Sequence, residues 1–496
     1  MNFMAMNTMR ETFHGYGKGK ELGSQTAVEC RFSQEVETVL SVHCAVALTG
    51  AEAGNGEVRY FGKAHFSIVY EDGEKRVCRA EKGVEWSAIH KDEEIFPALT
   101  PRVNIAVENI AVRREGASMY ITALLGAQIS LYGQQSFEYL AGGDLVLRRE
   151  NVQVLTAHLC GGAAETEDEF ETELFTDVLQ HAETVNITDI VCETGLLKVE
   201  GEINLCVLAL KGEGALVSFE RLVPFRIEIP CDAAGYGCRA EAKVNVLNVI
   251  LKAEADEERG RGRINAEFTL SAEGCVYEEV TVDAVTDAYS TESEVTLSYY
   301  DGAQSGVGET VRITERISGK AALSSSVDFS DTFEAISLQR AEANLVHGMG
   351  ETRVEGVAMA TLLVRGTDGG HRGIELSLPF SVPVQAAGCD VDVLVCGMSA
   401  RQKQEGEVDA EATLKITLRE RRKLTVHVVS GAEEGAPLPV NDSAVSVFIP
   451  RAGDGLWELS KSLKKPPEEV EASNPDIEFP IAEGQRVVIY RKKNLV

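Results

Sequence analysis

The segment Lys198-Val-Glu-Gly-Glu-Ile-Asn-Leu-Cys-Val-Leu-Ala209 occurs twice in this chain in closely similar form. Its second copy is Arg353-Val-Glu-Gly-Val-Ala-Met-Ala-Thr-Leu-Leu-Val364. After the glycine, Ile203, Leu205 and Val207 stand at every second position. A period of two is typical of a β-strand with one buried face. The chain therefore repeats a β-structured unit.

A fixed spacing extends the repeat to a third, weaker copy. In each copy an aromatic residue follows the glycine by 24 positions, and the pairs are Gly62 with Trp86, Gly201 with Phe225, and Gly356 with Phe380. Glycine and acidic residues between the two positions favour hairpin turns, at 71–73, 211–214 and 366–369. Each copy then has a second pair of alternating segments, such as 103–107 with 119–123. Helical periodicity is nearly absent before residue 450.

These patterns predict a mainly β protein of three tandem antiparallel sandwich-like domains followed by a small βααβ domain. Acidic residues 165–173 and the Gly- and Ser-containing stretch 290–308 suggest the borders between copies. The predicted division is an N-terminal tail at 1–25, β domains at 26–150, 151–297 and 298–430, a linker at 431–443, and the C-terminal domain at 444–493.

The C-terminal domain is predicted from local signals. Alternating Val445, Val447 and Ile449 indicate a strand, and Val487 with Ile489 a returning one. Apolar residues at helical spacing, beginning at Leu456, predict a first helix, with Trp457 beside its apolar face. Asp454 precedes this helix, and an aspartate is well suited to accept amide protons at a helix start. Pro467 is placed to start a second helix, and Asn474-Pro475 to end it.

Composition excludes several classes of function. The 496 residues carry a formal charge of −30, which disfavours nucleic acid and anionic lipid as general partners. No apolar run is long enough to span a bilayer, and no signal peptide is visible. The eleven scattered cysteines fit reduced thiols of a cytosolic protein, and we predict no metal, no cofactor and no catalytic residues. Motifs for serine hydrolases, zinc peptidases and phosphate-binding loops are missing.

The C-terminal segment resembles a LysM module, through Gly453-Asp-Gly-Leu-Trp, the Asn-Pro stop and Glu483-Gly-Gln. LysM modules bind N-acetylglucosamine polymers or have been turned to protein contacts. The resemblance places the binding groove between two loops. The candidate residues are Gly453, Asp454, Gly455, Leu456 and Trp457 in the first loop, and Asn474, Pro475, Asp476 and Ile477 in the second. The family usually has Thr where this chain has Gly455, which favours a protein ligand over a sugar.

The repeats resemble the SPOCS domain of endospore-forming bacteria, through the Val-Glu-Gly strand, its Pro-Phe partner and the phrase Asp287-Ala-Tyr-Ser-Thr-Glu. Several such domains before a terminal LysM is the layout of the SipL-like spore coat morphogenesis family. This resemblance implies a non-enzymatic adaptor in the mother-cell cytoplasm, at the forespore surface. Its C-terminal module would engage the ATPase that forms the basement layer of the spore coat.

Two other functions stay open from the sequence. One is a cell-wall protein that binds peptidoglycan through the LysM-like module. The other is an enzyme with an active site between β domains.

Overall fold

The computed structural model describes residues 7–116, 118–348, 350–385, 388–404, 407–439, 443 and 445–490. The described part is mainly β, with its two α-helices near the C-terminus, which confirms the predicted class. Parts of five predicted segments lie outside it: residues 1–6 of the tail, 117 of the first β domain, 349, 386–387 and 405–406 of the third, 440–442 of the linker, and 444 and 491–493 of the C-terminal domain. Neither helix in the described part has the length and apolar character needed to cross a membrane.

Eighteen strands form three units of six strands each. Unit 1 holds β1 (Thr8–Phe32), β2 (Thr38–Ala53), β3 (Glu57–Glu71), β4 (Val77–Lys91), β5 (Thr100–Glu115) and β6 (Ser118–Gly143). Unit 2 holds β7 (Val146–Glu173), β8 (Asp177–Glu193), β9 (Leu196–Leu210), the 3-10 turn η1 (Gly212–Gly214), β10 (Leu216–Pro230), β11 (Arg239–Asp256) and β12 (Arg261–Tyr289). Unit 3 holds β13 (Ser293–Leu323), β14 (Thr332–His347), β15 (Thr352–Arg365), β16 (His371–Val384), β17 (Cys389–Gln404) and β18 (Glu407–Pro437).

The three units share one topology. In each, the first strand pairs with the sixth and the sixth with the fifth, while the second, third and fourth form a separate meander. All pairings are antiparallel. The two sheets of each unit enclose an apolar core of its own. A short pairing of β13 with β16 joins the two sheets of unit 3 into one.

The glycine and the aromatic residue of each repeat are cross-strand partners: Gly62 with Trp86, Gly201 with Phe225, and Gly356 with Phe380. At each glycine the aromatic ring lies where a side chain would begin. A Cβ on Gly201, for example, would lie 2.4 Å from the Phe225 ring and 2.4 Å from the Asn186 carbonyl oxygen. The 24-residue spacing therefore records a contact, since it spans one hairpin and returns the aromatic opposite the glycine.

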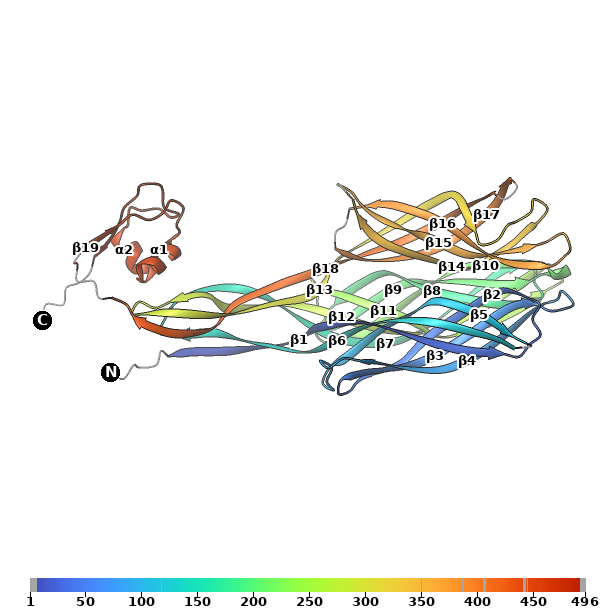
Figure 1. The fold of residues 1–496 in the computed structure, drawn as a ribbon, viewed down its shortest axis with the longest axis horizontal. Coiled ribbons are helices and arrows are strands. Elements are labelled where there is room, and N and C mark those ends of the chain that lie inside the picture. The colour runs from blue at the N-terminus through green and yellow to red at the C-terminus, as the bar shows by residue number, and fades with distance from the viewer. Residues whose placement is uncertain are drawn as a thin grey trace.

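Six strand ends project from the three units as a stalk (Figure 1). In this stalk, residues 8–17 pair with 133–143, 146–156 with 278–289, and 293–307 with 421–437. Phe137 stacks on Phe13 at 5.2 Å and on Tyr300 at 4.6 Å, and Val154 and Val428 pack against the same cluster. All three units thus share the interior of the stalk.

Several predicted borders are wrong, because the residues belong to strands of the stalk and its continuation. Residues 8–25 of the predicted tail are part of β1, and the acidic stretch 165–173 is part of β7. The stretch 290–308 lies mostly in β13, and 431–437 of the predicted linker end β18. Most Gly, Ser and acidic residues of these stretches are exposed or half-buried positions of the strands, where water can reach them, so their composition imitates that of a linker.

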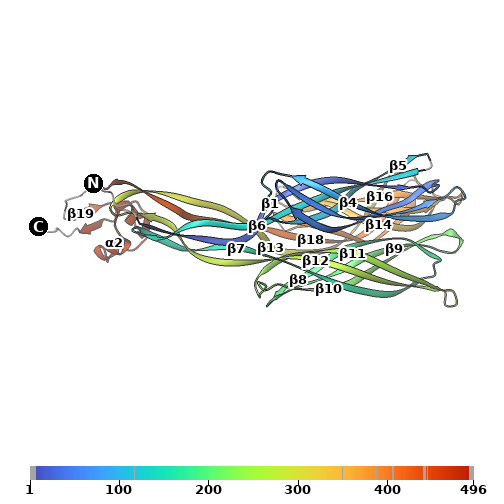
Figure 2. The ribbon, with the colours of Figure 1, turned by 90° about the horizontal axis from the view of Figure 1, so that it is seen from below.

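The part of the molecule away from the stalk is a head in which the three units pack against one another (Figure 2). Strand β4 contacts β8, β10 contacts β14, and β16 contacts β2, so the contacts run in a closed cycle. Residues from all three units, including Val69, Leu208 and Leu363, form one apolar cluster where they meet. The last contact is tight, since a Cβ on Gly373 of β16 would lie 1.8 Å from the Leu40 carbonyl oxygen.

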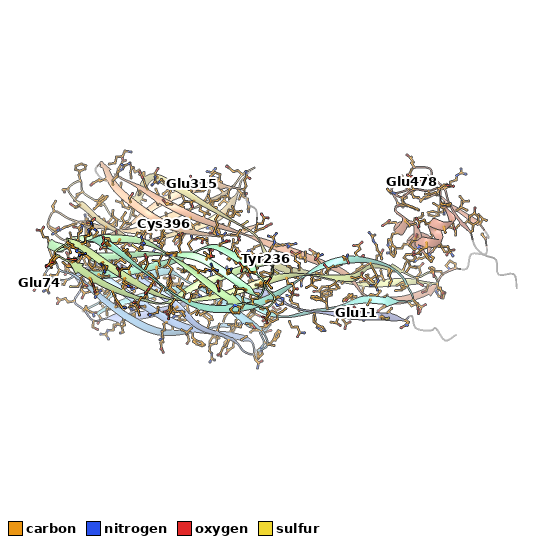
Figure 3. All side chains as sticks on the ribbon, turned by 180° about the vertical axis from the view of Figure 1, so that it is seen from behind. Glu11, Glu74, Tyr236, Glu315, Cys396 and Glu478 are labelled. Carbon is orange, nitrogen blue, oxygen red and sulfur yellow. The ribbon has the colours of Figure 1, made fainter. Side chains whose placement is uncertain are left out.

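The C-terminal module comprises β19 (Val445–Phe448), α1 (Leu456–Leu463), α2 (Pro467–Ser473) and β20 (Val487–Tyr490). Its two strands pair antiparallel, and its core holds Leu459, Val470, Ile481, Val487 and Ile489. The predicted helix face, the start at Pro467 and the stop at Asn474 are confirmed. The module sits at the tip of the stalk, far from Glu74 at the outer end of the head, as the labelled Glu478 shows (Figure 3).

Candidate functional site

The two predicted loops flank the core of the C-terminal module. Leu456 from the first loop and Ile477 from the second both pack against that core. Gly453 has a positive φ of 92° and donates its N–H to the Ile481 carbonyl at 2.8 Å, while Ile481 donates back to the Asp454 carbonyl at 2.9 Å. These backbone bonds tie the first loop to the segment that follows the second.

Asp454 does not cap α1, although its residue type is suited to that role. The N-cap is Gly455, which has no side chain to accept a hydrogen bond. The Asp454 carboxylate instead accepts the N–H of Arg451 at 3.0 Å. Asp454 therefore closes the turn that precedes the helix, and the N-cap position falls one residue later, at Gly455.

Asn474 is a structural residue. Its side-chain amide donates to the Val470 carbonyl at 2.8 Å and to the Val488 carbonyl at 2.9 Å, and its oxygen accepts the Val488 N–H at 2.7 Å. The side chain is buried, and each of its polar atoms already has a partner. Of the second loop, Pro475 and Asp476 are the residues exposed to solvent.

Trp457 points toward the stalk and not toward solvent. Its indole Nε1 donates to Asp287 Oδ2 at 2.8 Å, and the Lys461 ammonium lies 2.6 Å from Asp287 Oδ1. Burial alone would raise the pKa of Asp287, but the bonds from Lys461 and Trp457 outweigh it and leave the pKa below its ordinary value. Helix α1 is thus held at the end of β12 by a charged and partly buried contact.

Further contacts complete this docking. The Tyr289 ring meets the Trp457 ring edge-on at 5.2 Å, and its hydroxyl donates to the Lys465 carbonyl at 2.6 Å. Burial raises the pKa of Tyr289 to about 12, so the hydroxyl keeps its proton. Lys464 pairs with Glu294 at 3.0 Å. The segment that begins at Asp287 stands out in the sequence, but no pattern among neighbouring residues indicates that Asp287 bonds to Trp457, 170 positions later.

One face of the module remains open to solvent and apolar. Val445 lies opposite Tyr490 in the two-stranded sheet, and residues that are directly opposite share a face. Val447 is on that same face and Ile449 follows just beyond the strand. All four side chains are more than half exposed. We call these four residues the outer face of the module.

A cavity of about 840 Å³ lies where the three units meet at the base of the stalk. Strands from every unit line it, including β5, β11 and β17. Its wall includes six basic and six acidic side chains: Lys18, Arg102, Lys243, Lys415, Arg419 and Arg421 with Glu21, Glu241, Glu273, Glu342, Asp390 and Asp392. Sequence patterns did not reveal this cavity, because its lining residues are spread over almost the whole chain.

The described residues contain no group of three or more His, Cys, Asp or Glu side chains arranged to hold a metal ion. None of the eleven cysteines, all of which lie in the described residues, takes part in a disulfide. Comparison with protein-family models, with curated proteins and with solved structures finds no match to this chain.

Proposed function

We propose that this chain is a non-enzymatic scaffold in endospore coat assembly, whose C-terminal LysM-like module docks on a coat protein at the forespore surface. Following the resemblance of the repeats to SPOCS domains, the proposed partner is the ATPase of the coat basement layer. The observation that carries the proposal is the outer face of the module, which is apolar, solvent-exposed and held at the tip of a long stalk. Exposed apolar patches of this kind mark protein-interaction sites.

The arrangement of the module favours a protein ligand over a glycan. Asn474 lies in the loop expected to bind sugar, but all polar atoms of its side-chain amide are hydrogen-bonded within the module. Trp457, the aromatic residue of the other loop, is engaged by Asp287 of the stalk. What remains for a partner is the apolar sheet face, and aliphatic and aromatic side chains supply most of the affinity at protein interfaces.

The test uses the purified full chain and the purified basement-layer ATPase of an endospore former, with binding followed by biolayer interferometry. Val447→Glu places a charge on the outer face, away from the module core. We expect it to weaken binding by at least about tenfold, as burial of an unpaired charge in an interface would. The matched control is Ile250→Glu, on an exposed position of β11 in unit 2, which should bind as the wild type does.

Two results would count against the scaffold proposal. Equal binding by the wild type and Val447→Glu would remove the outer face as the docking site, and no binding by either would remove the partner. Sedimentation with purified peptidoglycan is the second arm. Sedimentation of the wild type, but not of a Leu456→Glu variant whose thermal unfolding is unchanged, would instead support the cell-wall function.

A further inference from the structure

The cavity at the base of the stalk has a size and a position that its role in packing does not require. Its volume of about 840 Å³ falls among those of small-molecule sites, which are about 300–1,000 Å³. It lies between units, each of which already has a closed apolar core of its own. Polar cavities of this kind hold water or a polar ligand.

Most cations of the cavity wall are paired with carboxylates. Arg102 lies 2.7 Å from Glu273, and Arg421 donates from Nε to Asp390 at 2.8 Å. The remaining pairs are Lys18 with Glu21, Lys415 with Glu202 and Arg419 with Asp392. The opposite charges within each pair largely cancel, so these side chains attract an anionic ligand only weakly.

Lys243 is the exception. This half-buried lysine of β11 makes no ion pair and no hydrogen bond to any residue that the structure describes. Its cross-strand neighbour is Glu273, but that carboxylate is paired with Arg102. Burial lowers the pKa of Lys243 to about 8, and the more distant Glu273 and Asp392 oppose the shift. An ammonium without a partner in a cavity is costly, and an anion would relieve the cost.

Comparison of the three units shows that a lysine at this position is specific to unit 2. Strands β5, β11 and β17 each carry a bulge at the same place, and Asn104, Lys243 and Val393 stand three residues before it. All three line the cavity. Because the equivalent positions hold an amide and an isopropyl group, the shared fold does not demand a lysine here.

A second polar group faces the same space. Glu241, two residues before Lys243, accepts hydrogen bonds from the Tyr277 hydroxyl at 2.6 Å and the Tyr132 hydroxyl at 3.2 Å. Burial raises the pKa of both tyrosines, so both hydroxyls stay protonated as donors. Glu241 is thereby satisfied without Lys243, which leaves the ammonium available.

We propose that this cavity binds a small organic monoanion of the carboxylate class, with Lys243 as the residue that pairs with the carboxylate. A monoanion fits the charges of the wall, because in the part of the chain that the structure describes Lys243 is the one lining cation without a carboxylate partner, whereas the lining carboxylates Glu241 and Glu342 have no cationic partner and would repel a more highly charged anion. A doubly charged phosphate would instead meet several carboxylates with only one ammonium to compensate. This site is separate from the docking face of the module and does not depend on the scaffold proposal.

The test measures binding of benzoate to the full chain by isothermal titration calorimetry near neutral pH, with inorganic phosphate as a second probe. We expect saturable binding of benzoate at one site per chain, weakened more than about tenfold by Lys243→Gln and restored by Lys243→Arg. Lys252→Gln is the control, since Lys252 lies on the same strand but is exposed and paired with Glu267. Affinity should fall as the pH rises through about 8, where Lys243 loses its charge.

A second measurement locates the ligand without a substitution. Bound benzoate should protect Lys243, but not Lys252, from reductive methylation, as read by peptide mass spectrometry. Three results would overturn the proposal: no saturable binding of benzoate, equal binding by the wild type and Lys243→Gln, or tighter binding of phosphate than of benzoate. The first would mean that the cavity holds water only.

Discussion

The repeat glycines show how a single missing side chain shapes a strand pair. At Gly201 and Gly356 the backbone of the neighbouring strand and an aromatic ring both lie within the space that a Cβ would take. The ring covers the glycine backbone and shields that stretch of strand from water, since no side chain is present to do so. The Val-Glu-Gly phrase is therefore a packing motif of the fold.

Gly201→Ala is expected to destabilise unit 2 by about 1–3 kcal/mol, because the added methyl group meets the Asn186 carbonyl and the Phe225 ring. Gly83→Ala is the matched control in a strand, since nothing lies within 4 Å of the place that its Cβ would take. Denaturant unfolding of both variants makes the comparison. A Gly201→Ala protein as stable as Gly83→Ala would contradict the proposed packing role.

His371 ties the units together near the outer end of the head, directly after the hairpin at 366–370. Its Nδ1 lies 3.1 Å from Glu71 of unit 1 and its Nε2 lies 3.4 Å from Glu334 of unit 3, and all three side chains are buried. Glu334 also accepts the backbone N–H of Leu216 from unit 2 at 2.9 Å and lies 3.8 Å from Arg365. One imidazole thus connects carboxylates that reach every unit.

This cluster predicts a loss of stability at higher pH. The Glu334 carboxylate raises the pKa of His371, burial lowers it, and Glu71 raises it again, with a net pKa above the ordinary value. Stabilisation by a raised histidine pKa is present at low pH and is lost as the pH rises through that pKa. As the pH rises from below to above the pKa of His371, the melting temperature of the wild type should therefore fall more steeply than that of His371→Gln. His14→Gln, at an exposed position of the stalk, should follow the wild type; parallel curves for all three would refute the prediction.

At the scale of elements, the C-terminal module depends on the link between α2 and β20. Asn474 makes that link, and its removal leaves two carbonyls and one N–H without their partners. Each buried backbone group that loses its partner costs about 1–3 kcal/mol. The module core is small, so such a loss matters more there than in the three large units.

Asn474→Ala should unfold the module while the units stay folded. Hydrogen exchange followed by mass spectrometry would show fast exchange in α1, α2 and β20 and unchanged protection in β9 and β15. Asp476→Ala, at an exposed position of the same loop, serves as the control. Unchanged exchange in the module of Asn474→Ala would show that these hydrogen bonds are dispensable.

Asp287 governs a different property, the docking of the module on the stalk. Asp287→Ala removes the acceptor of both Trp457 and Lys461, and hydrogen bonds to charged groups contribute about 1.5–3 kcal/mol each. We expect acrylamide to quench Trp457 fluorescence more strongly in this variant, against a background from Trp86, which is buried in unit 1. Asp283→Ala alters the same strand without touching the module and should leave quenching unchanged.

At the scale of the whole molecule, the stalk joins the three units through residues that meet in its interior. Its ribbons form no ladder between units in the described residues, so they are held together by side chains, which pack on one another and bond to backbone groups such as those of Leu155. Phe137, stacked between Phe13 and Tyr300, is central to this contact.

Phe137→Ala should loosen the stalk and leave the head intact. Loss of a buried phenylalanine typically costs about 3 kcal/mol or more. Hydrogen exchange should become faster in 146–156 and 421–437, which pack on the other sides of the stalk, with no change in β3. Tyr299→Ala, an exposed neighbour on β13, is the control. Equal protection of the stalk in both variants would mean that the aromatic stack does not hold the ribbons together.

Much of the local structure could be predicted from the sequence. Alternation identified the strands that contain the repeat glycines, and turn residues identified their hairpins. The candidate loops were located, but the roles of Asp454, Asn474 and Trp457 depend on partners elsewhere. Asp454 and Asn474 find their partners within the module, Asp454 at Arg451 and Asn474 at Val470 and Val488. Trp457 finds its own on β12.

Periodicity and spacing alone determined that this chain is built from three copies of an antiparallel β unit and a small helical module, because both signals come from neighbours along the chain. Tertiary structure alone decided that polar segments resembling linkers become a stalk, that Trp457 faces inward, and that Lys243 lines a cavity. These outcomes depend on which surfaces of distant segments meet. A period of two indicates that one face of a strand is buried, but it does not indicate which other segment of the chain covers that face.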